Sequence, residues 1–434
     1  MPIEEVPGTA LRYHLIAFDD QGRERSDDPA GRMSEVTAAA LAEEPITDVF
    51  IFSHGWMADL PAARRQYAKW VTAMAQSRAD LDQLAELRPA FRPLLVGLHW
   101  PSRPWSEEEF GAASFDPTAP TRLVEEYAAS IADTPAARDA LAVILSAALD
   151  DPDPPVLPPE VADAYAVLDR EAGLGAADPG GDPGADREPF DAGRIMRDAR
   201  TEVSFGRFDI GSVLAPLRAL SFWKMKDRGR RFGETGGRSL LDQLQQATRD
   251  TVRFHLMGHS FGCVVVSAIL AGPSGREPVR PVHSAALLQG AFSLWSYCTD
   301  IPVARGRPGY FHRAVGGRRV VGPIITSQSS YDIAVGRFYP LGAGVARQVD
   351  FAPGELPRYG AVGAFGLRGP GLAIEDRRLL PADQPYDFAP GRIYNLESSD
   401  IIRHGEGSFG AHSDLGHVEV THAVWQAAMA TAGS

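Results

Sequence analysis

One short segment of the sequence places a serine in a setting that suits a nucleophile. Residues 254–262 read Phe-His-Leu-Met-Gly-His-Ser-Phe-Gly, so Ser260 lies between Gly258 and Gly262 in a G-x-S-x-G pattern. The apolar residues before it predict a strand, and the apolar run 263–270 after it, closed by a Gly-Pro pair, predicts a helix. Such a sharp strand-to-helix turn projects the serine hydroxyl from the sheet, and flanking glycines have no Cβ to clash there. This arrangement suits attack of the Ser260 hydroxyl on a carbonyl carbon.

The segment resembles the nucleophile elbow of the α/β-hydrolase superfamily, which includes serine esterases and lipases. The resemblance covers residues 45–110 and 240–434, and His259 occupies the variable position before Ser260 in the motif. It implies an α/β-hydrolase fold and an acyl-enzyme on Ser260. It also implies that backbone N–H groups at the start of the following helix lie near the developing oxyanion.

A second motif supports the resemblance. The strand expected at Ile46–Phe52 leads directly into Ser-His-Gly-Trp. In the superfamily a His-Gly pair after the third strand opens the loop that contributes to the oxyanion hole. The resemblance therefore assigns this motif to His54, and the donor N–H groups to Gly55 or Trp56 and to Phe261.

The resemblance also implies an acid that follows the serine in the chain and precedes the histidine. Asp332 lies in the loop after the strand expected at Arg319–Thr326, which makes it the preferred acid. Such an acid accepts a hydrogen bond from the catalytic histidine and holds its tautomer. Asp400, just after the strand expected at Arg392–Leu396, is the alternative.

The preferred base is His412, in a loop shortly before the terminal helix expected at Val418–Met429. His404 and His417 lie close by and remain alternatives. His422 falls within the terminal helix and is expected to be a packing or surface residue. No histidine spacing matches a metal site backed by carboxylates, so neither a metal ion nor another cofactor is expected.

Short apolar runs rich in β-branched residues alternate with amphipathic helical patterns. This predicts an α/β protein with a mostly parallel, doubly wound sheet, the α/β-hydrolase fold implied by the resemblance. The expected strands are Leu11–Phe18, Ile46–Phe52, Leu94–His99, Arg253–Met257, His283–Gln289, Arg319–Thr326 and Arg392–Leu396.

The negative charge is concentrated in one stretch. The chain has 434 residues and a formal charge of −13, and residues 107–191 hold 20 acidic residues against four arginines. Pro- and Gly-rich breaks separate helical patterns there. We therefore expect a hydrolase core at 1–106 and 192–434, with a helical insertion at 107–191 after the fourth strand, placed to act as a cap. Its acidic residues either face solvent or fold over the basic segment 194–253.

Composition excludes several classes of partner. An acidic balance argues against nucleic-acid binding, and no apolar run approaches the length of a membrane span. Two cysteines and an acidic N-terminus without a signal-like pattern favour a soluble, cytoplasmic protein. Oligomeric state is left open.

The expected function is a serine hydrolase of the esterase or lipase type that cleaves a carboxylic ester, thioester or amide. Its expected partner is a small acyl substrate with an apolar or aromatic part, since Trp56, Trp100, Trp105, Phe292 and Trp295 lie near predicted strand ends. A non-catalytic binding or scaffold protein on the same fold is the alternative from another class. An acyltransferase that uses the same acyl-enzyme is a further alternative.

Overall fold

The computed structural model describes residues 3–29, 31–103, 119–201, 211–273, 277–317, 319–338, 356–405 and 410–431. The chain divides into two compact units. Unit 1 comprises Met1–Ser102, Arg228–Gly336 and Gly360–Ser434, and unit 2 comprises Arg103–Asp227 and Arg337–Tyr359. The insertion expected at 107–191 falls within the first segment of unit 2. That segment continues to Asp227, and unit 2 also includes a second segment, Arg337–Tyr359.

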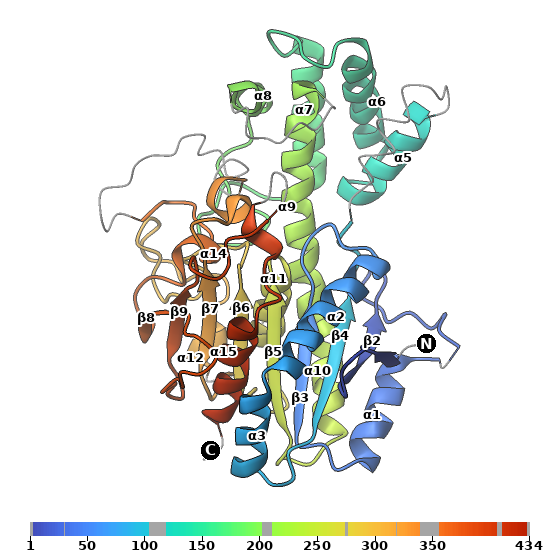
Figure 1. The fold of residues 1–434 in the computed structure, drawn as a ribbon. Helices are drawn as coiled ribbons and strands as arrows, with labels where there is room; N and C mark the ends of the chain where they lie inside the picture. Colours follow the sequence, from blue (N-terminus) through green and yellow to red (C-terminus); the bar gives the residue numbers. More distant parts are fainter. Residues whose placement is uncertain are drawn as a thin grey trace. The chain divides into compact units, whose positions relative to one another are not determined.

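Unit 1 is built on a nine-stranded sheet in the described part of the chain, with the order β1-β2-β4-β3-β5-β6-β7-β9-β8 (Figure 1). Only the edge pair β1–β2 is antiparallel, and the other pairs are parallel. The predicted α/β class with a mostly parallel sheet is therefore confirmed. The strands are β1 Ile3–Glu5, β2 Arg12–Ala17, β3 Asp48–Ser53, β4 Pro93–His99, β5 Arg253–His259, β6 Ser284–Leu288, β7 Ile324–Gln328, β8 Ile374–Arg378 and β9 Ile393–Glu397.

Helices cover both faces of this sheet. On one face α2, α3 and α15 pack together, and they lie in front of the strands in Figure 1. On the other face α11 contacts β3, β5 and β6, while α10 contacts α1 and α11. The helices of unit 1 are α1 Met33–Glu43, α2 Leu60–Gln76, α3 Arg78–Leu87, α10 Arg238–Gln246, α11 Gly262–Ala271, α12 Arg313–Gly316, α14 Val362–Phe365 and α15 Val418–Met429.

The alternation of side chains in the central strands explains the two layers. Phe50 and Phe52 of β3 point to the same face, where their rings pack edge-on against Trp425 of α15 and Trp70 of α2. All ten residues of α11 are buried, so this helix is apolar on every side. The central strands are covered on both faces, which is why they are almost continuously hydrophobic.

The sequence prediction located the central strands but neither of the two edge strands. β1 (Ile-Glu-Glu) and β8 (Ile-Glu-Asp-Arg-Arg) were missed because charged edge strands lack the apolar run of a buried strand. The run expected at 319–326 was wrong in its first half, since β7 begins only at Ile324. Pro323 precedes it and has no N–H to donate to a ladder.

Unit 2 is helical in its described residues. It contains α5 Ala119–Ile131, α6 Pro135–Asp150, α7 Pro159–Ala172, α8 Ala192–Thr201 and the first part of α9 Ala215–Phe232, which continues into unit 1. Acidic and basic segments meet here in places: the ammonium of Lys226 on α9 lies 2.9 Å from the carboxylate of Asp186, and both side chains are buried. Lys224 donates to the carbonyl oxygen of Ala172 at the end of α7 (2.6 Å).

Within the described ranges, no helix is both long and apolar enough to cross a membrane.

Candidate active site

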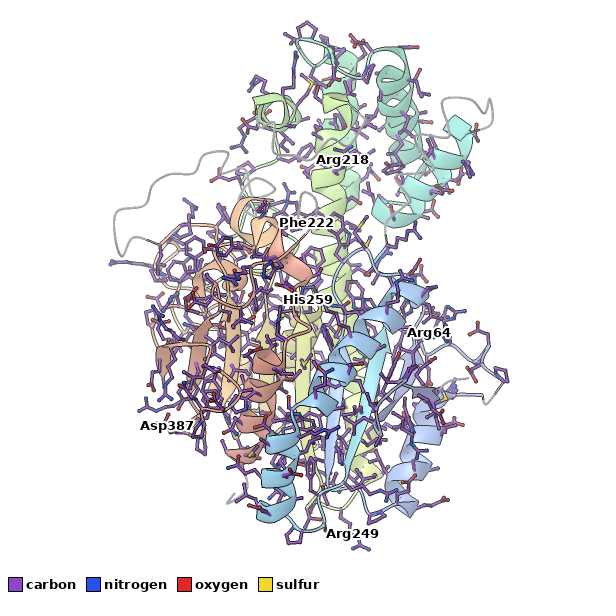
Figure 2. The ribbon with its side chains drawn as sticks, in the orientation of Figure 1. Arg64, Arg218, Phe222, Arg249, His259 and Asp387 are labelled. Atoms are coloured by element: carbon purple, nitrogen blue, oxygen red, sulfur yellow. The ribbon has the colours of Figure 1, made fainter. Side chains whose placement is uncertain are left out.

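The two sequence motifs lie beside each other at the carboxyl ends of adjacent parallel strands. Ser53, the last residue of β3, pairs in register with Gly258 of β5. At this point the strand order changes direction, because β4 lies on one side of β3 and β5 on the other. Open α/β sheets bind their ligands outside the carboxyl ends of strands at such a switch point. Figure 2 shows His259, the last residue of β5, at this end of the strand.

Ser260 lies on a strained turn between β5 and α11. Its φ is +57°, a left-handed conformation that non-glycine residues seldom adopt. A Cβ on Gly258 would lie 2.4 Å from the carbonyl oxygen of Gly262, and a Cβ on Gly262 would lie 2.1 Å from that of Ser53. Both flanking glycines are therefore required for this approach of backbone to backbone. Strain of this kind is typical of functional positions.

The loop after β3 brings Gly55 against Ser260. A Cβ on Gly55 would lie 2.7 Å from Ser260 Cβ and 3.3 Å from its Oγ. Burial, and then the neighbouring His99, lower the pKa of His54 to about 3, so its ring is neutral. Its Nδ1–H donates to the carbonyl oxygen of Gly55 (2.8 Å), and its Nε2 accepts from the backbone N–H of Trp100 (3.3 Å). The His54 ring thus holds the loop in place through the backbone.

The two other expected oxyanion donors flank the same turn. Phe261 directly precedes α11, and its carbonyl oxygen accepts from the N–H of Val265 in the first helical turn (3.1 Å). The ring of Trp56 lies 6.0 Å from that of Phe261, measured between centroids. Met57, which follows in the loop, has a φ of +64°, so this loop is also conformationally strained.

The structure brings Asp332 and His412 together across 80 residues of sequence. His412 Nδ1 lies 2.8 Å from Asp332 Oδ2, and the Asp332 side chain is fully buried. Asp332 lies after β7, and His412 lies in η5 (Ala411–Ser413) before α15. Because Nδ1–H donates to the carboxylate, Nε2 is the nitrogen left to accept a proton.

The structure gives no hydrogen bond between Ser260 Oγ and His412 Nε2, both of which are described. Their link runs through His259, whose ring centroid lies 4.8 Å from that of His412 and whose Nε2 lies 2.8 Å from the His412 carbonyl oxygen. Catalytic hydrogen bonds are often long before substrate binds and shorten in the complex. In the described residues the hydrogen bonds thus join Asp332 to His412 and His412 to His259, the neighbour of Ser260, without a complete relay to the Ser260 hydroxyl.

Gln289 is a site residue that the sequence analysis missed. Its Nε2 donates to Asp332 Oδ2 (2.7 Å), the same oxygen that His412 contacts, and its Oε1 accepts from the hydroxyl of Ser327 (3.0 Å). Its φ of +47° is one of the three positive values for non-glycine residues in the described chain. It directly follows β6, between the strands that lead to Ser260 and Asp332. A glutamine directly after a central strand has no distinctive sequence pattern, so local sequence did not indicate this role.

The alternative acid and bases lie in other surroundings. Asp400 is exposed and approaches the guanidinium of Arg378 (3.6 Å). His417 bonds to Asp414 (2.7 Å), and the backbone N–H of His404 donates to the same carboxylate (2.9 Å). None of these contacts involves Asp332 or His412.

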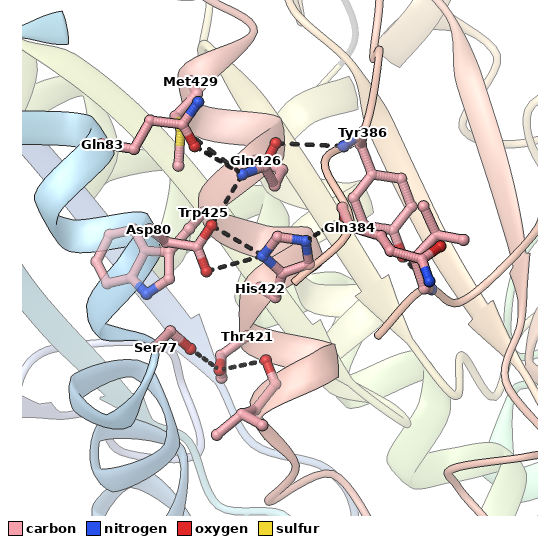
Figure 3. A network of polar contacts seen from close by, with 12 residues as sticks. Ser77, Asp80, Gln83, Gln384, Tyr386, Thr421, His422, Trp425, Gln426 and Met429 are labelled. Carbon is pink, nitrogen blue, oxygen red and sulfur yellow. Dashed lines mark hydrogen bonds and ion pairs between the residues drawn. The ribbon is translucent and has the colours of Figure 1, made fainter. Parts of the chain in front are cut away.

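His422 is a packing residue, as expected. Its Nδ1 lies 2.8 Å from both carboxylate oxygens of Asp80 on α3, and its Nε2 lies 2.9 Å from the carbonyl oxygen of Gln384 (Figure 3). Gln426 donates to the same carboxylate (2.8 Å). This network joins α3, α15 and the segment before β9. In the described ranges no group of three or more His, Cys, Asp or Glu side chains is arranged to hold a metal ion.

Most of the aromatic residues proposed to line a pocket are core residues. Trp100, Phe292 and Trp295 are buried, and the Trp100 ring stacks on His54. Trp56 is partly exposed, and Trp105 lies outside the described residues. Among the described residues of this set, Trp56 alone is exposed enough to contact an aromatic group of a substrate.

Comparisons with known proteins give no independent identification. No protein-family model matches the chain, and neither a curated protein nor a solved structure matches it.

Proposed function

We propose that this chain is a serine hydrolase with an α/β-hydrolase fold, which cleaves an ester-type bond through an acyl-enzyme on Ser260. The observation that supports this most directly is the hydrogen-bonded pair Asp332–His412 on loops beside the strained turn of Ser260. A nucleophile, a base and an orienting acid are the three parts of a catalytic triad.

In the proposed reaction, Ser260 Oγ attacks the substrate carbonyl while His412 Nε2 accepts its proton. Asp332 stabilises the imidazolium that forms, because its buried carboxylate accepts the Nδ1–H. Collapse of the tetrahedral intermediate breaks the bond to the alcohol, which leaves with the proton from His412. Water then attacks the acyl-enzyme, gives its proton to His412, and releases the acid and the free Ser260 hydroxyl.

Backbone N–H groups would stabilise the oxyanion in both steps. The candidates are Phe261, at the start of α11, and Gly55 or Trp56, in the loop that His54 holds against Ser260. The positive end of the α11 dipole adds to this stabilisation. Removing one such donor typically lowers kcat by about 10²–10³-fold.

A fluorophosphonate probe and a p-nitrophenyl ester series test the proposal. We expect covalent labelling at Ser260 and ester hydrolysis, and a loss of roughly 10⁴–10⁶ in kcat for Ser260→Ala with the fold intact. Ser239→Ala, at an exposed position on α10, is the matched control. Folded wild-type protein that is neither labelled nor active would favour a non-catalytic role. Labelling with slow hydrolysis that an added alcohol accelerates would indicate an acyltransferase.

A further inference from the structure

The side chain of His259 contacts the loop that carries His412. The next residue, Ser260, begins the turn into α11, which covers the opposite face of the sheet. Side chains alternate along β5, so His259 shares a face with Met257, which belongs to the core under α2 and α15. The His259 ring packs edge-on against Trp70 of α2, with 6.2 Å between centroids. It is 4% exposed. One strand end therefore directs two consecutive side chains to two different parts of the site.

Both ring nitrogens of His259 have partners. Nε2 lies 2.8 Å from the carbonyl oxygen of His412, and Nδ1 lies 2.8 Å from Nε2 of Gln66 on α2. A carbonyl oxygen only accepts, so Nε2 must carry the proton. Nδ1 of a neutral ring is then an acceptor, which the side-chain amide of Gln66 satisfies as a donor. Burial, and then the neighbouring His412, hold the pKa of His259 well below its usual value, in agreement with a neutral ring.

The hydrogen bonds from Gln66 to His259 and from His259 to His412 hold the backbone of His412, not its ring. Asp332 binds His412 through Nδ1, and His259 binds it through the main-chain carbonyl oxygen. The second contact comes from the residue next to Ser260, so it restrains the distance between the nucleophile and the base. The loop is also joined to its neighbours by the backbone hydrogen bond from Ala411 N–H to the carbonyl oxygen of Tyr331 (3.0 Å) and by Asp414, which accepts from the backbone N–H of His404 (2.9 Å).

We infer that His259, oriented by Gln66, is a positioning residue that holds the His412 loop at its working distance from Ser260. This inference rests on the proposed function. A displacement of about 1 Å between reacting groups costs on the order of 100-fold in rate, so loss of this restraint should lower kcat and leave KM nearly unchanged.

The test compares His259→Leu, which removes both hydrogen bonds, with His259→Gln, whose amide reproduces one donor and one acceptor without titrating. We expect kcat for p-nitrophenyl butyrate to fall about 100-fold in His259→Leu, with KM within about twofold, and to recover most of that loss in His259→Gln. Gln66→Leu should show a smaller loss in the same direction, because His259 then loses the donor that fixes its tautomer. Gln76→Leu, an exposed position on the same helix, should behave as wild type.

The outcomes separate the inference from the proposed function. A folded His259→Leu protein with wild-type kcat would overturn the inference alone, and so would a Leu variant that is impaired but not improved by Gln. If His259→Leu does not fold, Gln66→Leu decides: wild-type kcat there overturns the positioning role, and a lower kcat at constant KM supports it. A wild-type chain without Ser260-dependent turnover would overturn the proposed function and this inference with it.

Discussion

Gly55 and Ser260 approach each other so closely that no side chain fits between them. A Cβ on Gly55 would lie 2.7 Å from Ser260 Cβ, closer than non-bonded carbon atoms come. Gly55 and Ser260 come from loops after β3 and β5, which are 205 residues apart in sequence but paired in register. The proposed nucleophile and the proposed oxyanion loop are thus in direct contact.

Gly55→Ala should therefore disturb the site more than the fold. The added methyl group forces the loop or Ser260 to move, and we expect kcat to fall on the order of 100-fold. Gly316→Ala is the control, since a Cβ at Gly316 meets nothing within 4 Å. Steady-state kinetics and thermal unfolding of both variants check this. Equal activity in the two alanine variants would contradict it.

Ser260→Gly should be more stable than Ser260→Ala. The φ of +57° at this position strains alanine and suits glycine, and the difference should be about 1 kcal/mol in the free energy of unfolding. Both variants should be inactive because both lack the hydroxyl. Urea unfolding of the pair measures the difference, and an alanine variant as stable as the glycine variant would show that the turn is not strained.

Asp332→Asn should lower kcat by roughly 10⁴-fold, as expected when the orienting acid of a triad is neutralised. The amide no longer favours the tautomer with a proton on Nδ1 of His412. Asp400→Asn, at the exposed alternative position, should leave kcat unchanged. If Asp400→Asn lowered kcat in an ester assay and Asp332→Asn did not, Asp400 would be the orienting acid.

Gln289→Met should lower kcat roughly tenfold, the value of about one hydrogen bond to a charged group. The substitution keeps the length of the side chain but removes the donor to Asp332 Oδ2. Gln328→Met is the control at the end of the neighbouring strand, where the side-chain oxygen has no hydrogen-bond partner in the described structure. If both variants keep wild-type kcat, Gln289 contributes only to packing.

Stability should fall at alkaline pH through His422. Burial acts to lower its pKa, but the hydrogen bonds to Asp80 and to the Gln384 carbonyl oxygen outweigh burial and raise it (Figure 3). A raised pKa in the folded state stabilises the protein fully below the unfolded value of about 6.5, and this stabilisation is lost as pH rises through the folded value.

Urea unfolding at about pH 6 and about pH 9 measures this contribution. The wild type should lose more unfolding free energy over this interval than Asp80→Asn, which lacks the charged partner. Asp82→Asn, exposed on the same helix, should follow the wild type. An equal pH dependence in all three proteins would show that the pair does not titrate in this range.

Local sequence patterns were sufficient for the central strands, for the turn at Ser260 and for α15. The terminal helix was predicted at the residues where it occurs, because its beginning and end are local features. The order of strands, by contrast, depends on which crossover lies on which face. No local pattern indicates that β3 lies between β4 and β5.

The pairing of the proposed acid with the proposed base depends on the tertiary structure. From position alone, Asp332 and Asp400 were both reasonable acids, and His404, His412 and His417 were all reasonable bases. In the folded chain Asp332 is buried after β7 and contacts the partly buried His412, whereas Asp400 and His404 are exposed. Gln66 and Gln289 could not be found at all, since a glutamine on a helix or after a strand has no distinctive local pattern.

Residues close together in the chain were sufficient to predict the apolar strands, the glycine-flanked turn and the helix after it. Which side chains meet depends on the folded chain as a whole, because hydrogen bonds such as Gln289–Asp332 and His259–His412 join residues that are 43 and 153 positions apart. A strand end fixes where a side chain begins. What it contacts depends on the register of its neighbours and on the helices packed over them.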